Sequence, residues 1–185
     1  MKPLHLLNCS AAALMLTALS VHARNVTSPD GRFAVRAEAE ILLIDSAGEP
    51  LLTLIRNTAA DTRVEVAWST DSRRVVIVEN TARSCDIIAA YQDAGVWHKT
   101  IELDSDQAAL IRQAQLDVGG RLVSEQQTLG QWVSETAVEV HGTMTFSSGH
   151  HVAYQYVLEF GTGPGRLDRG GYEEGVIRGV RYQLH

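Results

Sequence analysis

A short repeat near the N-terminus constrains the fold of this chain more than any other feature. Residues 28–35 read SPDGRFAV, and residues 69–76, which lie 41 positions later, read STDSRRVV. An Asp in this position hydrogen-bonds the backbone of its own turn, and Gly accepts a positive φ, so each copy predicts a tight turn. β-Branched residues follow both turns and predict that each turn leads into a β-strand.

The stretch from Ser28 to Leu103 resembles the blades of TolB-like and WD-repeat-like bacterial β-propellers. Those blades carry Ser-Pro-Asp-Gly before a strand, often with a Trp before the Ser, and Trp68 occupies that position in the second copy. The offset of 41 residues matches the length of one four-stranded blade, about 40–45 residues. The resemblance therefore implies two blade-like meanders, while two chance hairpin turns are the alternative. Because closure takes roughly four to eight blades, we expect no closed propeller.

The first 23 residues have the pattern of a secretory signal peptide. Lys2 supplies the positive charge, Leu4–Val21 supplies a mostly apolar core, and Val21-His22-Ala23 fits a small-x-small cleavage site. A retained membrane anchor would need about 20 apolar residues. A lipoprotein acylated at Cys9 is the other alternative, but Cys9 precedes most of the apolar run instead of following it. We therefore expect a secreted or periplasmic protein that is cleaved after Ala23.

The remaining segment, residues 24–185, is long enough for one domain with a sizeable core. Loss of Lys2 with the leader takes the net charge from −6 to −7, which argues against nucleic-acid partners. No transmembrane segment is expected in this part. Cys85 is the only Cys left, so no internal disulfide is expected, and its apolar strand context predicts a buried structural thiol instead of a reactive one.

Hydrophobic periodicity divides this domain into three parts. Residues 24–103 read as strand after strand, with Val75–Val78 apolar on both faces, as in a central strand that is covered on both sides. Residues 104–120 read as the one helix, with a capping box from Asp104 to Gln107 and a stop at Gly119-Gly120. Residues 121–185 read as an antiparallel sheet, in which residues 152–160 alternate most clearly and residues 147–149 form a hairpin turn.

The sequence therefore predicts a mainly β protein. It has two blade-like antiparallel β-meanders, one helix and a C-terminal antiparallel sheet of three or four strands, and it does not close into a propeller.

Few residues suggest chemistry. His141 and His151 are expected on the same polar face of a hairpin and are weak candidates for a metal pair, although no further ligand is visible to complete a site. The Gly-rich loop at residues 161–171 lacks the Lys and the following helix of a phosphate loop. Its charged residues, Arg166, Asp168 and Arg169, make it the expected place of contact with a partner.

Two classes of function fit these observations. One is a non-enzymatic binding or interaction protein, with an envelope protein or a glycan as partner and without a cofactor. The other is a small periplasmic hydrolase whose catalytic residues are scattered. The sequence has neither a Gly-x-Ser-x-Gly elbow nor a His-Glu-x-x-His motif, which favours the binding protein.

Overall fold

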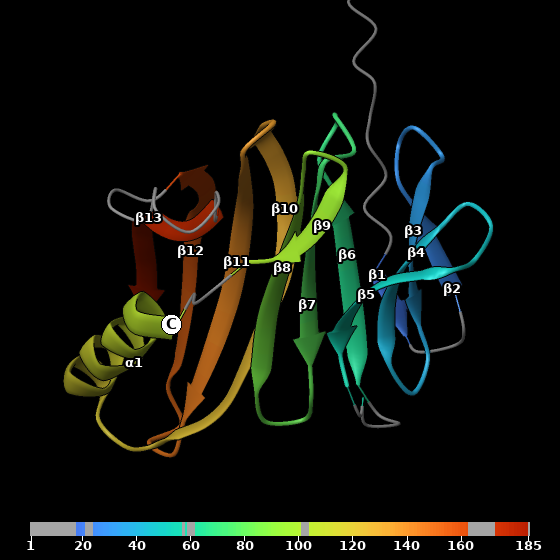
Figure 1. Ribbon diagram of the computed structural model, residues 1–185. Coiled ribbons are helices and arrows are strands. Elements are labelled where there is room, and N and C mark those ends of the chain that lie inside the picture. The colour runs from blue at the N-terminus through green and yellow to red at the C-terminus, as the bar shows by residue number, and fades with distance from the viewer. Residues whose placement is uncertain are drawn as a thin grey trace, which may run out of the picture.

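The computed structural model describes residues 18–20, 24–56, 58, 62–100, 104–162 and 173–184. Three antiparallel sheets follow one another in a row, and a helix lies beside the third sheet (Figure 1). We name them the first meander, the second meander and the C-terminal sheet. None of them closes on itself, so the fold class predicted from the sequence is confirmed.

The first meander has the strand order β2-β3-β4-β5, and the second has the order β1-β6-β7-β8-β9. All their pairings are antiparallel. Their bounds are Arg24–Thr27 (β2), Phe33–Ala37 (β3), Ile41–Asp45 (β4), Pro50–Ile55 (β5), Ala18–Ser20 (β1), Arg63–Trp68 (β6), Arg74–Asn80 (β7), Cys85–Asp93 (β8) and Val96–Lys99 (β9).

The C-terminal sheet has the order β10-β11-β12-β13 and is preceded by the helix α1. The bounds are Asp104–Val118 (α1), Leu122–Ser134 (β10), Ala137–Phe146 (β11), His151–Thr162 (β12) and Glu173–Leu184 (β13). Gly119 and Gly120 have φ of 71° and 84°, and the Gly119 N–H donates to Gln115 O at 2.9 Å. The helix therefore ends at the predicted glycines. Among the described residues, no helix is long and apolar enough to cross a membrane.

The two copies of the sequence repeat form matching turns. Asp30 Oδ1 accepts from the Ser28 hydroxyl at 2.7 Å and from the Arg32 N–H at 3.0 Å. Asp71 Oδ1 accepts from the Ser69 hydroxyl at 2.6 Å and from the Arg73 N–H at 3.0 Å. The residue after each Asp has a positive φ, 73° at Gly31 and 60° at Ser72. The prediction that each Asp bonds the backbone of its own turn is confirmed.

The two turns also contact each other. The Asp30 N–H donates to Ser72 Oγ at 3.1 Å, which joins the two meanders at one end. Burial raises the pKa of Asp30, but the hydrogen bonds from Arg32 and Ser28 outweigh this effect and lower the pKa from 3.8 to about 2. Asp30 therefore stays ionised across the physiological range, and the turn keeps its acceptor.

Two apolar cores hold the three sheets together, and β7 contributes to both. Val75 and Ile77 face the first meander, where they pack with Val35, Leu43 and other residues of that sheet. Val76 and Val78 pack instead against the C-terminal sheet. All four β7 residues are fully buried, which confirms the prediction that Val75–Val78 is a central strand covered on both faces.

The second meander joins the C-terminal sheet by an unusual seam. Strand β10 is an edge strand of its own sheet, and its outward backbone groups are satisfied mainly by side chains. Asn80 Nδ2 donates to Gln127 O at 2.7 Å, and Asn80 Oδ1 accepts from Gln127 N–H at 2.9 Å. Two positions further along, Glu65 Oε2 accepts from the Leu129 N–H at 3.0 Å. Side chains thus take the place of a neighbouring strand along this edge.

Cys85 lies in the same region and is 7 % exposed, so its predicted burial is confirmed. We expect its thiol to react slowly with a thiol reagent in the native protein and rapidly in denaturant, because the reagent reaches it only after local or global opening. Labelling of a Cys9→Ser chain, followed by mass spectrometry, measures this difference. Equal rates in both conditions would contradict the buried position.

Candidate functional site

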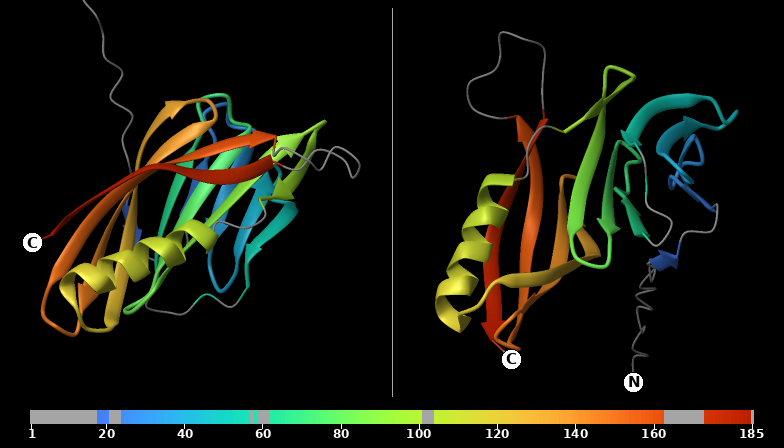
Figure 2. Two further views of the ribbon diagram at one scale, coloured as in Figure 1. Left: turned by 90° about the vertical axis from the view of Figure 1, so that its left-hand side faces the viewer. Right: turned by 90° about the horizontal axis from the view of Figure 1, so that it is seen from below.

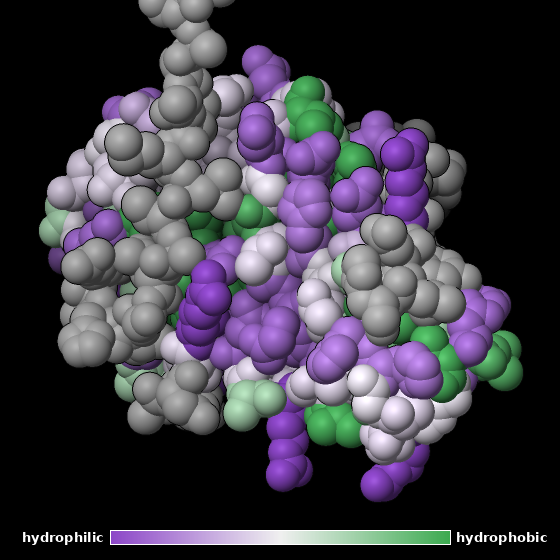
Figure 3. Space-filling view, turned by 180° about the vertical axis from the view of Figure 1, so that it is seen from behind, coloured by the Kyte–Doolittle hydropathy of each residue, from purple (hydrophilic) through white to green (hydrophobic). Residues whose placement is uncertain are grey.

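The C-terminal sheet has one buried face and one exposed face. Its inner face is apolar and packs against β7 of the second meander and against α1, through residues such as Val140, Leu158 and Ala114. The side chains that alternate with these point to the outer face. Seen from behind (Figure 3), the middle of the molecule is dominated by hydrophilic residues. Among the residues that the structure describes, the side chains of this outer face are exposed, so the face is available for binding.

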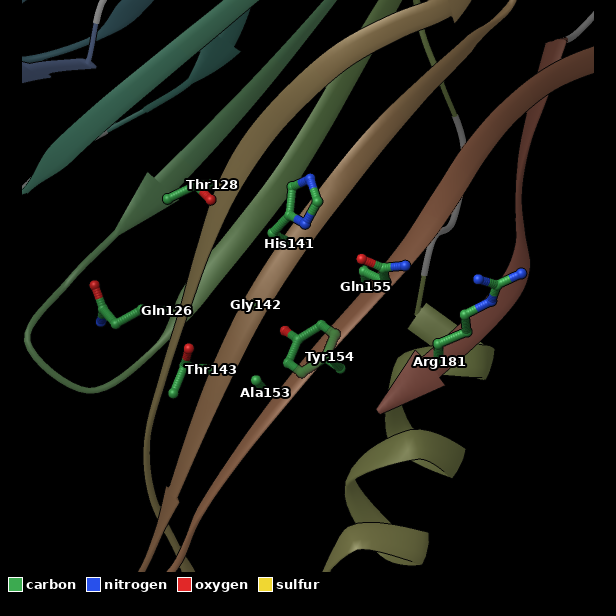
Figure 4. Close-up of a pocket in the computed structure, with 9 residues that line it drawn as sticks. All are labelled: Gln126, Thr128, His141, Gly142, Thr143, Ala153, Tyr154, Gln155 and Arg181. Carbon is green, nitrogen blue, oxygen red and sulfur yellow. The ribbon is translucent and has the colours of Figure 1, made fainter. Parts of the chain in front are cut away.

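The strand register aligns four polar residues in one row across this outer face. Thr128 pairs with His141, His141 with Gln155, and Gln155 with Arg181. All four are exposed, and Figure 4 shows their side chains in a line from Thr128 to Arg181. Since neighbouring strands are about 4.8 Å apart, the row spans about 14 Å from β10 to β13. We call it the polar row.

The polar row lies in a groove of about 550 Å³ (Figure 4). The volume falls in the range of small-molecule sites, about 300–1,000 Å³. Most of the side chains that line the groove donate or accept hydrogen bonds, and the charge is concentrated at Arg181. The lining consists of the polar row together with Gln126, Gly142, Thr143, Ala153 and Tyr154.

The floor of the groove is fixed from the buried side. Gly142 pairs with Tyr154, and the Tyr154 ring lies where a Cβ at Gly142 would be, so only Gly fits this position. The Tyr154 hydroxyl donates to a carboxylate oxygen of Glu125 and accepts from Gln127 Nε2 at 2.7 Å. Tyr156 stacks on Tyr154 with ring centroids 6.2 Å apart. These contacts hold β10, β11 and β12 in one register beneath the polar row.

The buried tyrosines keep their protons. Burial raises the pKa of Tyr154 above its ordinary value, and the Glu125 carboxylate raises it further. Burial also raises the pKa of Tyr156, with Cys85 and Glu125 adding to the effect. Tyr154 therefore acts as a neutral hydrogen-bond donor to Glu125 and has a structural role below the groove.

His141 and Arg181 are the basic residues among the described side chains that line the groove. His141 Nε2 lies 4.0 Å from Glu139 Oε2, and both side chains are nearly half exposed. Arg181 is exposed and forms no ion pair with any residue that the structure describes. A cation at one end of a polar groove attracts an anionic group.

The two histidines named from the sequence share the outer face but do not meet. His141 pairs with Gln155, whereas His151 pairs with Thr145, four residues further along β11. This separation along the strand is about 14 Å, too far for both rings to bind one ion. His151 Nδ1 instead lies 3.1 Å from Thr145 Oγ1. Among the described residues, no group of three or more His, Cys, Asp or Glu side chains forms a metal site.

The loop residues Arg166, Asp168 and Arg169, expected to contact a partner, lie outside the described residues. Three members of the polar row, Thr128, Gln155 and Arg181, are not among the site residues predicted from the sequence. The alternation in residues 152–160 assigns Gln155 to the polar face, so the sequence does indicate that this one side chain is exposed. The alignment across four strands depends on the register, which the pattern within one strand does not give.

Comparison with protein-family models, with curated proteins and with solved structures finds no match for this chain.

Proposed function

We propose that this chain is a secreted or periplasmic binding protein without catalytic activity, and that it holds a polar ligand in the outer groove of the C-terminal sheet. The observation that carries the proposal is the polar row, in which Thr128, His141, Gln155 and Arg181 are aligned in an open groove. Regularly spaced donors and acceptors fit a ligand with many hydroxyl groups. A glycan therefore fits the groove better than an apolar segment of another protein.

The side-chain contacts favour binding over the hydrolase alternative. A nucleophile needs a base within hydrogen-bond reach. Among the described residues, neither Thr128 nor Thr143 is hydrogen-bonded to His141, whose Nε2 lies 4.0 Å from Glu139 Oε2. His98 and His150 do not line the groove. The His98 ring stacks on Tyr91 with centroids 5.4 Å apart, and His150 Nδ1 lies 3.1 Å from Ser148 Oγ. These histidines have neighbours of their own away from the groove.

We further propose that the two meanders are related to propeller blades of the TolB-like and WD-repeat-like type. The matched hydrogen bonds around Asp30 and Asp71 support this relation, as does the face-to-face packing of the meanders. In this proposal, the meanders form a rigid base on which the C-terminal sheet presents its groove.

The proposed location gives a separate prediction. The intact mass of the exported protein is expected to correspond to a chain that starts at Arg24, because the leader is removed after Ala23. Mass spectrometry of the protein from the periplasm or the medium measures it. A product that still carries Met1, or that is acylated at Cys9, would contradict the location.

The binding function is tested by following backbone amide NMR signals during titration with three classes of compound: neutral oligosaccharides, acidic oligosaccharides and short peptides. We expect one class to shift the amides of β10, β11 and β12 around the polar row. The double variant Thr128→Ala/Gln155→Ala should lose these shifts. The variant Gln131→Ala, at an exposed position of β10 outside the groove, is the matched control and should keep them. Shifts that occur only elsewhere in the protein would overturn the proposed site.

A further inference from the structure

Arg181 places a positive charge at one end of the groove. It lies on β13 at one end of the polar row, while the other three members, Thr128, His141 and Gln155, carry no permanent charge. No Asp or Glu is among the described residues that line the groove. The carboxylate of Glu139, on the same face, has its Oε2 4.0 Å from His141 Nε2.

The local charge is opposite to that of the whole protein. The chain carries a net charge of −6, yet its groove presents a guanidinium without a described acidic partner. A strongly acidic polymer would be repelled by the protein as a whole, whereas a ligand with one negative charge would meet only the favourable field at Arg181. A guanidinium also presents a planar fork of N–H groups, which matches the two oxygens of one carboxylate.

We propose that the ligand is a sugar that carries a single carboxylate, of the uronic-acid type. This inference rests on the proposed binding function and specifies its ligand class. The carboxylate pairs with Arg181, and Gln155 on the neighbouring strand holds the adjacent hydroxyl groups through its amide. His141 and Thr128 then contact the hydroxyls of the next sugar unit along the polar row. The acid end thus lies at β13 and the neutral end at β10.

The test compares three disaccharides of nearly equal shape: cellobiose, cellobiouronic acid and the methyl ester of cellobiouronic acid. Affinities for the full chain are measured from amide shifts in the groove at pH 7 and low ionic strength. The acid is expected to bind at least about tenfold more tightly than either neutral compound, which corresponds to about 1.4 kcal/mol. Because the contact is exposed to solvent, the advantage should shrink as salt is added.

Variants of Arg181 assign the effect to this side chain. Arg181→Gln should remove the preference for the acid, so that the acid, its methyl ester and cellobiose bind this variant with similar affinities. Arg181→Lys, which keeps the charge but loses the planar fork, should retain part of the preference. Arg121→Gln changes the net charge equally at an exposed position outside the groove lining and should behave like the wild type. Thermal unfolding of each variant verifies that it is folded.

The outcomes separate this inference from the proposed function. The proposed pairing of a carboxylate with Arg181 would be overturned by equal affinity for the acid and its methyl ester, or by a preference that survives in Arg181→Gln. The groove would then remain a site for neutral sugars. If these three disaccharides leave the groove amides unshifted while peptides shift them, the ligand class is wrong and the binding site stands. If no class of compound shifts the groove amides, the proposed function fails as well.

Discussion

The variant Trp68→Ala is expected to lose about 3–5 kcal/mol of unfolding free energy, the usual cost of removing a large aromatic side chain from a core. Trp68 is 6 % exposed and lies in the core between the two meanders. Its ring meets Trp97 edge to face at 5.8 Å, and its Nε1–H donates to Val26 O at 3.0 Å. The alanine variant therefore loses apolar burial, an aromatic contact and a hydrogen bond between the meanders.

Two further variants separate these contributions. Trp68→Phe keeps an aromatic ring but removes the donor to Val26, so it should cost less than Trp68→Ala. Asp71→Ala, in the turn that follows Trp68, should cost only about 1 kcal/mol, because it removes local turn hydrogen bonds at a partly exposed site. Chemical denaturation measures the unfolding free energy of all three variants, Trp68→Ala, Trp68→Phe and Asp71→Ala. If Trp68→Ala has no effect on stability while Asp71→Ala has a large one, the contact between the meanders does not depend on this indole.

The parts of the fold that the sequence predicts are those encoded locally. The turn at Asp71 uses its own side chain and the residues two positions before and after it, Ser69 and Arg73, so the local sequence is sufficient to predict it. The helix end at Gly119 also uses a nearby partner, since its N–H donates to Gln115 O four positions earlier. Local rules apply wherever all the partners lie within a few positions.

The candidate site depends on partners that are distant in the chain. Arg181 joins Thr128 in one row only because three pairings hold the register between β10 and β13. A shift by one residue in any pairing would turn one of these side chains to the other face. The register is held partly by Tyr154 above Gly142, a contact that no pattern within a single strand reveals.

The seam between the second meander and the C-terminal sheet is a second feature that the sequence conceals. Asn80 follows an apolar strand, where a polar residue ordinarily indicates that the strand has reached solvent. In the structure Asn80 is 4 % exposed, and its amide pairs with both backbone groups of Gln127. The amide imitates the peptide group of a neighbouring strand, and an edge that would otherwise recruit another chain is closed within the protein.

The variant Asn80→Ala is therefore expected to lose about 3 kcal/mol of unfolding free energy. The N–H and the C=O of Gln127 both lose their partner, and water cannot replace it because Gln127 is only 1 % exposed. A buried backbone group without a partner costs about 1–3 kcal/mol, and Asn80→Ala leaves two. Asn80→Asp keeps the acceptor for the Gln127 N–H and loses the donor, so it separates the two contributions.

Gln126→Ala is the matched control for this seam. Gln126 also reaches across it, with Nε2 donating to Thr81 O at 2.7 Å, but its side chain is exposed and water replaces the lost contact. Chemical denaturation should give a cost below about 1 kcal/mol for Gln126→Ala and a several-fold larger cost for Asn80→Ala. Since the same amide closes the edge of β10, Asn80→Ala should also associate more readily at high concentration, as light scattering would show. Equal and small costs for both variants would mean that the backbone of Gln127 finds other partners and that packing alone holds the seam.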